Sequence, residues 1–118
     1  MTGTDTSCDV RLVYITTDGT ESARAIARTL VKERLAACAN VLNPMISVYR
    51  WNGAVHEDRE TVLIAKTAVS RVEELTARVK ALHAYECPCV VSVPVDGGNQ
   101  AFLVWVDAET AASDAGGD

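Results

Sequence analysis

The dipeptide Asn52-Gly53 constrains the fold more than any other feature, because it lies between two long runs rich in strand-forming residues. Both residue types tolerate the positive φ that a two-residue type I′ hairpin requires at its central positions. A strand ending near Trp51 is therefore expected to fold back onto one that starts near Ala54. Pro44 interrupts the first strand, and since proline cannot donate a ladder hydrogen bond, it predicts a sheet edge or a bulge.

Other strands and helices are indicated on both sides of this hairpin. Residues 10–17 and 89–95 are apolar runs with β-branched residues, which predict two buried strands. Apolar residues at steps of three and four predict a helix between each of these strands and the hairpin. The first helix is expected to be capped by Thr20, and the second by a capping box over 70–73. A last helix is expected to follow an N-cap at Asn99.

The order strand–helix–strand–strand–helix–strand, followed by a C-terminal helix, indicates an α+β domain of the ferredoxin-like, or split β-α-β, type. In this arrangement two helices cover one face of an antiparallel sheet, and the other face is left open. We assign five apolar residues to the open face, namely Val41, Ile46, Val48, Leu63 and Ala65. Apolar area of that extent favours association with further copies of the chain.

Length and composition limit the class of protein. For 118 residues we expect one domain over 10–110, with flexible segments at 1–9 and 111–118. The net charge of −5 argues against a nucleic-acid partner, which would need Lys and Arg gathered on one face. No run approaches the ~20 apolar residues of a membrane span, and the first residues lack a secretory signal. We therefore expect a cytoplasmic protein with reduced thiols.

The stretch LHAYECPCVV, residues 82–91, places His83, Glu86, Cys87 and Cys89 close together. Side chains at i and i+2 of an extended segment point to the same side, so the two thiols are able to meet one ion. Thiolates favour soft ions such as Cu(I) or Zn(II). A structural alternative stays open, because free cysteines commonly pack as small hydrophobes and a histidine at a helix end interacts with the helix dipole.

The remaining chemistry-bearing residues give weaker signals. Cys38, at a helix-to-strand junction, is expected to be a buried packing thiol, and Cys8 an incidental one. No nucleophile motif such as G-x-S-x-G occurs, so we do not expect an enzyme. A candidate pocket combines aromatic and charged residues, with core or subunit packing as the alternative. Its residues are Tyr49, Trp51, Glu60, Lys66, Tyr85 and Trp105.

Two segments together resemble the CutA divalent-cation tolerance proteins. They are ERLAACANVLNPMISVYRWNGAVHEDRETVLIAKT, residues 33–67, and LHAYECPCVVSVPVDGGNQAFLVWV, residues 82–106. The shared features are the LAAC-N junction, the S-x-Y-x-W-x-G hairpin, the KT strand end and the H-x-Y-E-x-P segment. The resemblance implies a homotrimer of ferredoxin-like subunits whose hairpins embrace neighbours. It also implies a protein that binds copper or other divalent metal ions and supports tolerance to them.

The chain departs from the copper-ligand pattern put forward for some members of that family. Ile15 and Leu82 stand where those members have a cysteine and a first histidine, so that only His83 remains. The predicted metal ligands are therefore His83, Cys87 and Cys89. The alternative function is a trimeric signalling module, similar to the PII-type nitrogen regulators, that binds a small effector in clefts between subunits. The absence of Lys or Arg beside the glycine turn at 97–98 disfavours a phosphate-bearing effector.

Overall fold

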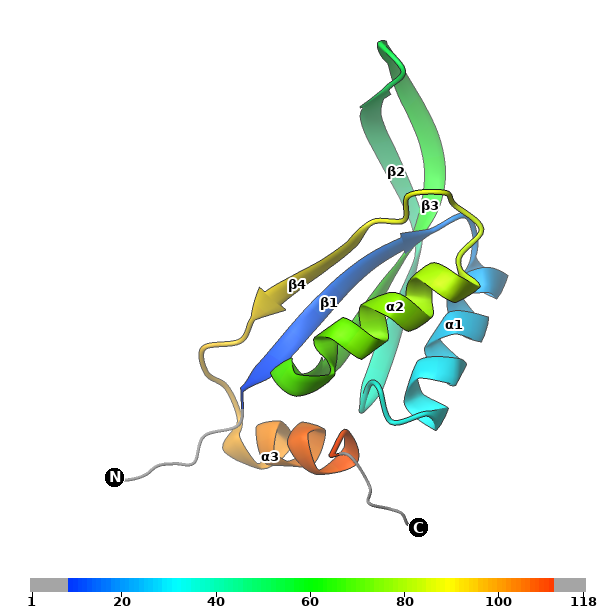
Figure 1. Cartoon of the computed structure of the whole chain (residues 1–118). Coiled ribbons are helices and arrows are strands. Elements are labelled where there is room, and N and C mark those ends of the chain that lie inside the picture. Colours follow the sequence, from blue (N-terminus) through cyan, green and yellow to red (C-terminus); the bar gives the residue numbers. More distant parts are fainter. Residues whose placement is uncertain (1–8, 112–118) are drawn as a thin grey trace.

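The computed structural model describes residues 9–111. Cys8 and nearly all of the two segments predicted to be flexible therefore lie outside the described residues. The elements follow the predicted order and are drawn in Figure 1. They are β1 (Val10–Thr17), α1 (Thr20–Lys32), β2 (Cys38–Trp51), β3 (Ala54–Ala68), the short 3-10 helix η2 (Val69–Arg71), α2 (Val72–Leu82), β4 (Val90–Pro94) and α3 (Gln100–Glu109).

The four strands form one sheet in the order β2-β3-β1-β4, and every neighbouring pair is antiparallel. This confirms the predicted α+β class and the antiparallel sheet. Helices α1 and α2 cover one face of the sheet (Figure 1). The main core lies between them and the two central strands, and its members include Val13, Ile15, Ile26, Leu30, Leu35, Leu63, Leu75 and Val79. None of the helices in the described part of the chain is long and apolar enough to cross a membrane.

The assignment of residues to the open face of the sheet was partly wrong. Leu63 and Ala65 are fully buried under the helices, and Val41 packs against the same core. The pairing explains this, because Leu63 lies opposite the core residue Ile15 and side chains across one pair share a face. The open face instead carries four apolar residues that are 36–51% exposed, namely Tyr14, Leu42, Val91 and Val93. Strand β4, predicted to be buried, is thus a half-exposed edge.

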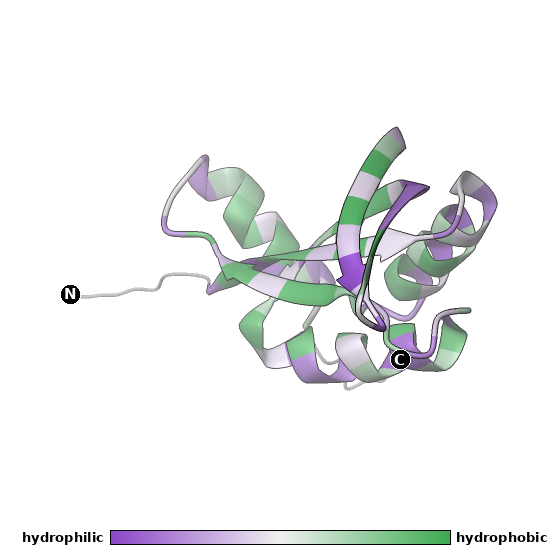
Figure 2. Ribbon diagram, turned by 90° about the horizontal axis from the view of Figure 1, so that it is seen from above, coloured by the Kyte–Doolittle hydropathy of each residue, from purple (hydrophilic) through white to green (hydrophobic). Residues whose placement is uncertain are grey.

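Strands β2 and β3 extend beyond the sheet as a two-stranded arm, which comprises residues 45–60. Strand β1 pairs with β3 only up to Thr61, so the arm pairs with itself alone. At its tip Asn52 and Gly53 have φ of 51° and 77°, which confirms the predicted turn. A register shift next to Pro44, on the edge strand β2, confirms the predicted irregularity. Hydrophobic residues are spaced along the arm (Figure 2), and they include Ile46, Val48 and Val55, each more than half exposed.

Of the three N-terminal helix caps predicted from the sequence, the structure confirms one. Asn99 caps α3, since its side-chain oxygen accepts a 3.1 Å hydrogen bond from the Ala101 amide. Thr20 is instead the first residue of α1, whose N-cap position is Gly19 and has no capping side chain. The capping box at 70–73 is also wrong, because η2 runs into α2 and takes Ser70 into a 3-10 turn. The short 3-10 helix therefore leads into α2 in place of the predicted side-chain cap.

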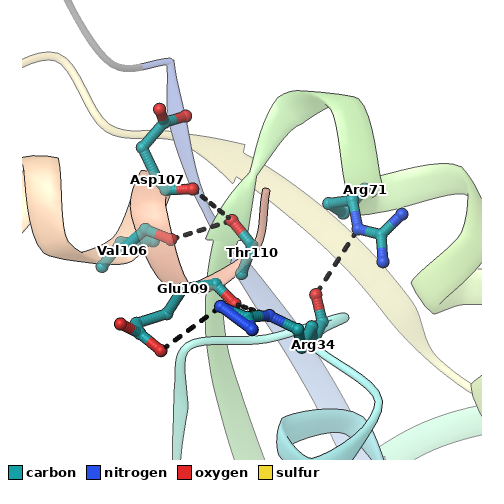
Figure 3. A network of polar contacts seen from close by, with 6 residues as sticks. All are labelled: Arg34, Arg71, Val106, Asp107, Glu109 and Thr110. Carbon is teal, nitrogen blue, oxygen red and sulfur yellow. Dashed lines mark hydrogen bonds and ion pairs between the residues drawn. The ribbon is translucent and has the colours of Figure 1, made fainter. Parts of the chain in front are cut away.

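Helix α3 is held at the end of the sheet farthest from the arm (Figure 1). Arg34, in a left-handed conformation with φ of 61°, donates a 3.2 Å hydrogen bond from Nε to the carbonyl oxygen of Glu109. The carbonyl oxygen of Arg34 in turn accepts a hydrogen bond from Arg71 Nε at 3.4 Å (Figure 3). Val106, fully buried, joins Val10 in a second small core. Residues carried by α3 are therefore remote from the arm.

Candidate functional site

A cavity of about 600 Å³ lies where the arm meets the loop between α2 and β4. The loop crosses the base of the arm in Figure 1. The two sides of the cavity come from segments far apart in the sequence. The arm contributes Tyr49, Trp51, Asp58 and Glu60, and the loop contributes Tyr85, Glu86, Cys87 and Cys89. These four arm residues lie on one face of the two-stranded ribbon, because side chains two residues apart on a strand point to the same side. Asp58 pairs with Ser47, which is two residues from Tyr49, and Trp51 pairs with Ala54, which is four residues from Asp58.

Two phenols are tied to two carboxylates in this cavity. Tyr85 donates a 2.6 Å hydrogen bond from its hydroxyl to Glu60 Oε2, and the Tyr49 hydroxyl donates to Asp58 Oδ2. Burial, and then the hydrogen bond to Glu60, raise the pKa of the Tyr85 phenol well above its ordinary value. The hydrogen bond to Asp58 is the main cause that raises the pKa of Tyr49. Both phenols therefore stay protonated donors at neutral pH and hold the carboxylates in place.

The electrostatic character of the cavity is negative. Its charged lining residues, within the described part of the chain, are the acids Asp58, Glu60 and Glu86. The two arginines of the arm, Arg50 and Arg59, pair with Val55 and Ile46 and belong by alternation to the opposite face of the ribbon. A concave surface lined by one sign of charge concentrates ions of the other sign. The cavity therefore favours cations over phosphates.

His83 lies beside the cavity with both ring nitrogens engaged. Its Nε2 donates to the carbonyl oxygen of Thr16 at 2.7 Å, and its Nδ1 accepts from the amide of Tyr85 at 3.0 Å. A carbonyl requires a donor and an amide requires an acceptor, so these bonds assign the neutral Nε2–H tautomer. No ring lone pair is left for a metal ion in this arrangement. His83 instead joins the loop to β1 and packs against the Tyr85 ring at 4.6 Å.

The other predicted ligands, Cys87 and Cys89, are exposed and line the same cavity. Within residues 9–111 no group of three or more His, Cys, Asp or Glu side chains is arranged to hold a metal ion. The structure thus brings the two thiols to one cavity without His83 as a free third ligand. The set of three metal ligands stays a prediction.

Four of the six predicted pocket residues meet in the cavity, namely Tyr49, Trp51, Glu60 and Tyr85. The other two lie elsewhere. Lys66 bonds to Asn40 in the body of the sheet, and Trp105 packs on Phe102 in α3 with ring centroids 5.6 Å apart. Sequence reasoning missed Asp58, although its i, i+2 spacing from Glu60 was a usable signal. Cys38, expected to be buried, is half-buried.

Comparison with known proteins gives a consistent result. The family model described as CutA1 divalent ion tolerance protein matches residues 11–109. The divalent-cation tolerance protein CutA of Thermus thermophilus is 46% identical over 99 residues, which are 84% of this chain and 96% of that protein. Protein CutA 1, chloroplastic, of Oryza sativa is 39% identical over 113 residues, and the match covers 96% of this chain but only 64% of the rice protein.

The solved structures agree with the sequence relatives. The crystal structure of CutA1 from Oryza sativa superposes with a TM-score of 0.87 at 38% identity, covering 91% of this chain and 98% of that one. The structure of the divalent cation tolerance protein from Thermus thermophilus superposes with a TM-score of 0.85 at 44% identity, covering 86% of this chain and 99% of that one. The fold that builds the cavity therefore recurs in the CutA1 protein of Oryza sativa and in the divalent cation tolerance protein of Thermus thermophilus.

Proposed function

The chain belongs to the CutA1 divalent ion tolerance family, and from this membership we propose that it binds copper or other divalent metal ions as part of tolerance to them. We propose further that it does so without catalysis, as a cytoplasmic homotrimer of ferredoxin-like subunits. The observation that carries the metal proposal is the pair of exposed thiols, Cys87 and Cys89, at the edge of an acidic cavity.

The two thiols have the chemistry and the placement for a soft ion. Cys87 and Cys89 are separated by one residue and line one cavity, so one ion is within reach of both. Thiolate sulfur favours Cu(I) and Zn(II) over hard ions such as Mg²⁺, which prefer oxygen ligands. Glu86 and the negative potential of the cavity attract the cation. Two thiolates alone make a linear Cu(I) site, whereas Zn(II) would need further ligands from water or from a second copy.

The arm and the open sheet face support the homotrimer. An isolated two-stranded hairpin is marginally stable in water, and this arm carries Ile46, Val48 and Val55 more than half exposed. The open face adds Tyr14, Leu42, Val91 and Val93. Copies of the same chain would cover both surfaces, and a closed ring of three would leave neither exposed.

The signalling alternative receives less support from the cavity. A PII-like effector that carries phosphate would need Lys or Arg beside it, and the charged residues lining this cavity within the described chain are acidic. A metal cation is instead favoured by acidic residues. The cavity thus supports the tolerance proposal over a phosphate-binding signalling module.

A competition titration with a Cu(I) chelator tests the proposal. The assembled protein is compared with the double variant Cys87→Ser, Cys89→Ser and with Cys38→Ser, a matched thiol change outside the cavity. We expect the double variant to lose most of its Cu(I) affinity and Cys38→Ser to keep it. The affinity should also fall as the pH falls, because the metal must displace the thiol protons. Equal affinity in the native protein and the double variant would reject the proposed site.

A further inference from the structure

The cavity at the base of the arm is much larger than a metal ion needs. Its volume is about 600 Å³, whereas a water molecule occupies roughly 30 Å³ of the liquid. Small-molecule sites in proteins commonly span about 300–1,000 Å³. We propose that the arm side of this cavity, formed by Tyr49, Asp58 and Glu60 together with Tyr85 of the facing loop, binds a small organic ammonium ion with an apolar body.

Two aromatic rings are available to such a cation. Tyr49 comes from the arm, and Tyr85 comes from the facing loop. The faces of tyrosine and tryptophan rings attract ammonium groups within about 6 Å, and recognition of organic cations by several rings is a common use of this interaction. The rings also supply apolar surface for the hydrocarbon part of the ligand. A bare metal ion would leave this surface unused.

The rings are held in position before any ligand arrives. The hydroxyl of Tyr85 is bonded to Glu60 at 2.6 Å, and the hydroxyl of Tyr49 is bonded to Asp58. His56 stacks on the Tyr49 ring from the same strand pair, with centroids 5.6 Å apart and an interplanar angle of 22°. Fixing a site in its bound geometry removes part of the entropic cost of binding.

The carboxylates supply charge and hydrogen-bond acceptors. An ionised carboxylate has about four acceptor positions, and each phenol uses one of them. Asp58 and Glu60 therefore keep acceptor positions for the N–H groups of an ammonium ion. The other acidic lining residue, Glu86, adds to the same potential. A neutral or anionic ligand of the same shape would gain nothing from these charges.

This site goes beyond the proposed metal function and rests on different residues. The thiols proposed to hold metal, Cys87 and Cys89, belong to the loop side of the cavity, whereas Asp58, Glu60 and the Tyr49 ring belong to the arm. The two ligand classes are therefore separable by substitution. A variant that lacks both thiols is expected to keep its affinity for the organic cation.

Calorimetric titration of the assembled full chain with benzylamine at neutral pH tests the inference. Benzylamine is an ammonium ion under these conditions, while benzyl alcohol and benzoate are the neutral and anionic counterparts of nearly the same shape. We expect saturable binding of benzylamine, and binding of the other two that is weaker by roughly tenfold or more. Similar affinity for benzylamine and benzyl alcohol would contradict the inference. Benzylamine binding that does not saturate would also contradict the inference, and this is the result expected if a second copy of the chain fills the cavity.

Substitutions assign the binding to the named residues. The double variant Asp58→Asn, Glu60→Gln should bind benzylamine at least about tenfold more weakly, because it loses both charges but keeps its size. Glu57→Gln is the matched control, since Glu57 is exposed on the arm, pairs with Val48 and does not line the cavity. Circular dichroism and solution mass should be unchanged in both variants. Unaltered benzylamine affinity in the double variant would overturn the assignment.

The two proposals fail separately. Benzylamine binding that persists in Cys87→Ser, Cys89→Ser supports the organic-cation site, whatever happens to copper in that variant. Benzylamine binding that disappears together with both thiols would contradict a site built on the arm. Copper affinity is read independently in the chelator competition.

Discussion

The hydroxyl of Tyr85 lies 2.6 Å from Oε2 of Glu60, and this hydrogen bond joins the loop after α2 to the base of the arm. The two residues are 25 positions apart in the sequence. Both residues line the cavity, so the contact links its loop side to its arm side.

Replacing Tyr85 with Phe should destabilise the fold while leaving its packing intact. The change removes a partly buried hydrogen bond to a charged acceptor, for which we expect a loss of roughly 1–2 kcal/mol in the free energy of unfolding. Urea denaturation at fixed protein concentration measures it. Tyr14→Phe is the control, because the Tyr14 hydroxyl makes only a 3.5 Å contact to the Met45 sulfur. Equal losses in both variants would show that the bond to Glu60 has no special role.

The same bond predicts how stability depends on alkaline pH. The folded-state pKa of Tyr85 is raised above its ordinary value of 10.0, so the folded protein keeps the phenol proton more tightly than the unfolded chain does. This contribution to stability is fully present below pH 10 and is lost as the pH rises from there toward the folded-state pKa. Denaturation midpoints measured between about pH 8 and 11 should fall less steeply for Tyr85→Phe than for the native protein. Parallel slopes would contradict the prediction.

The thiols should react in an order set by their exposure. Cys87 and Cys89 are exposed and Cys38 is half-buried, so a charged thiol reagent should modify the first two faster. A Cys8→Ser background removes the thiol outside the described residues. Labelling followed by peptide mass analysis assigns each rate. Bound Cu(I) should protect Cys87 and Cys89 without changing the rate at Cys38, and equal protection at all three sites would argue against a local site.

The elements that the sequence predicted well are those encoded by adjacent residues. Asn52-Gly53 fixes a turn by its own backbone preferences, and Asn99 caps a helix by accepting from an amide two residues away. The faces of the sheet were harder, because a shift of one residue in register moves a side chain to the other face. Leu63 was therefore misassigned, since its burial depends on the pairing of β3 with Ile15 in β1. The residues adjacent to Leu63 in the sequence do not determine how β3 pairs with β1.

The same limit applies to the site. The sequence brought His83 and the two thiols together as ligands because they are neighbours in the chain. Both nitrogens of His83 are engaged, and one partner is the carbonyl of Thr16, 67 positions away. Trp105 was assigned to the predicted pocket because it is one of the aromatic residues that flank the motifs, but α3 places it against Phe102. Residue types suggest which side chains are able to bind a ligand, but tertiary contacts decide which of these side chains reach the cavity and which are already engaged.

Trp51→Ala should weaken the proposed trimer. Trp51 lies next to the tip of the arm and is 50% exposed in the single chain, as expected of an anchor for a neighbouring subunit. Truncating an aromatic anchor commonly costs at least about 2 kcal/mol of association free energy. Sedimentation equilibrium over a dilution series measures the dissociation constant. Glu57→Gln on the same arm serves as the control, and an unchanged dissociation constant for Trp51→Ala would remove it as an anchor.

Native mass spectrometry after loading with Cu(I) tests whether the chain forms a copper-binding trimer, because one spectrum reports both the number of chains and the number of copper ions. We expect a species of three chains that carries copper in proportion to its chains. The double variant Cys87→Ser, Cys89→Ser should remain a trimer but lose that copper. A monomer as the main species would rule out the trimer, and the same copper content in the native protein and the double variant would rule out the thiol site.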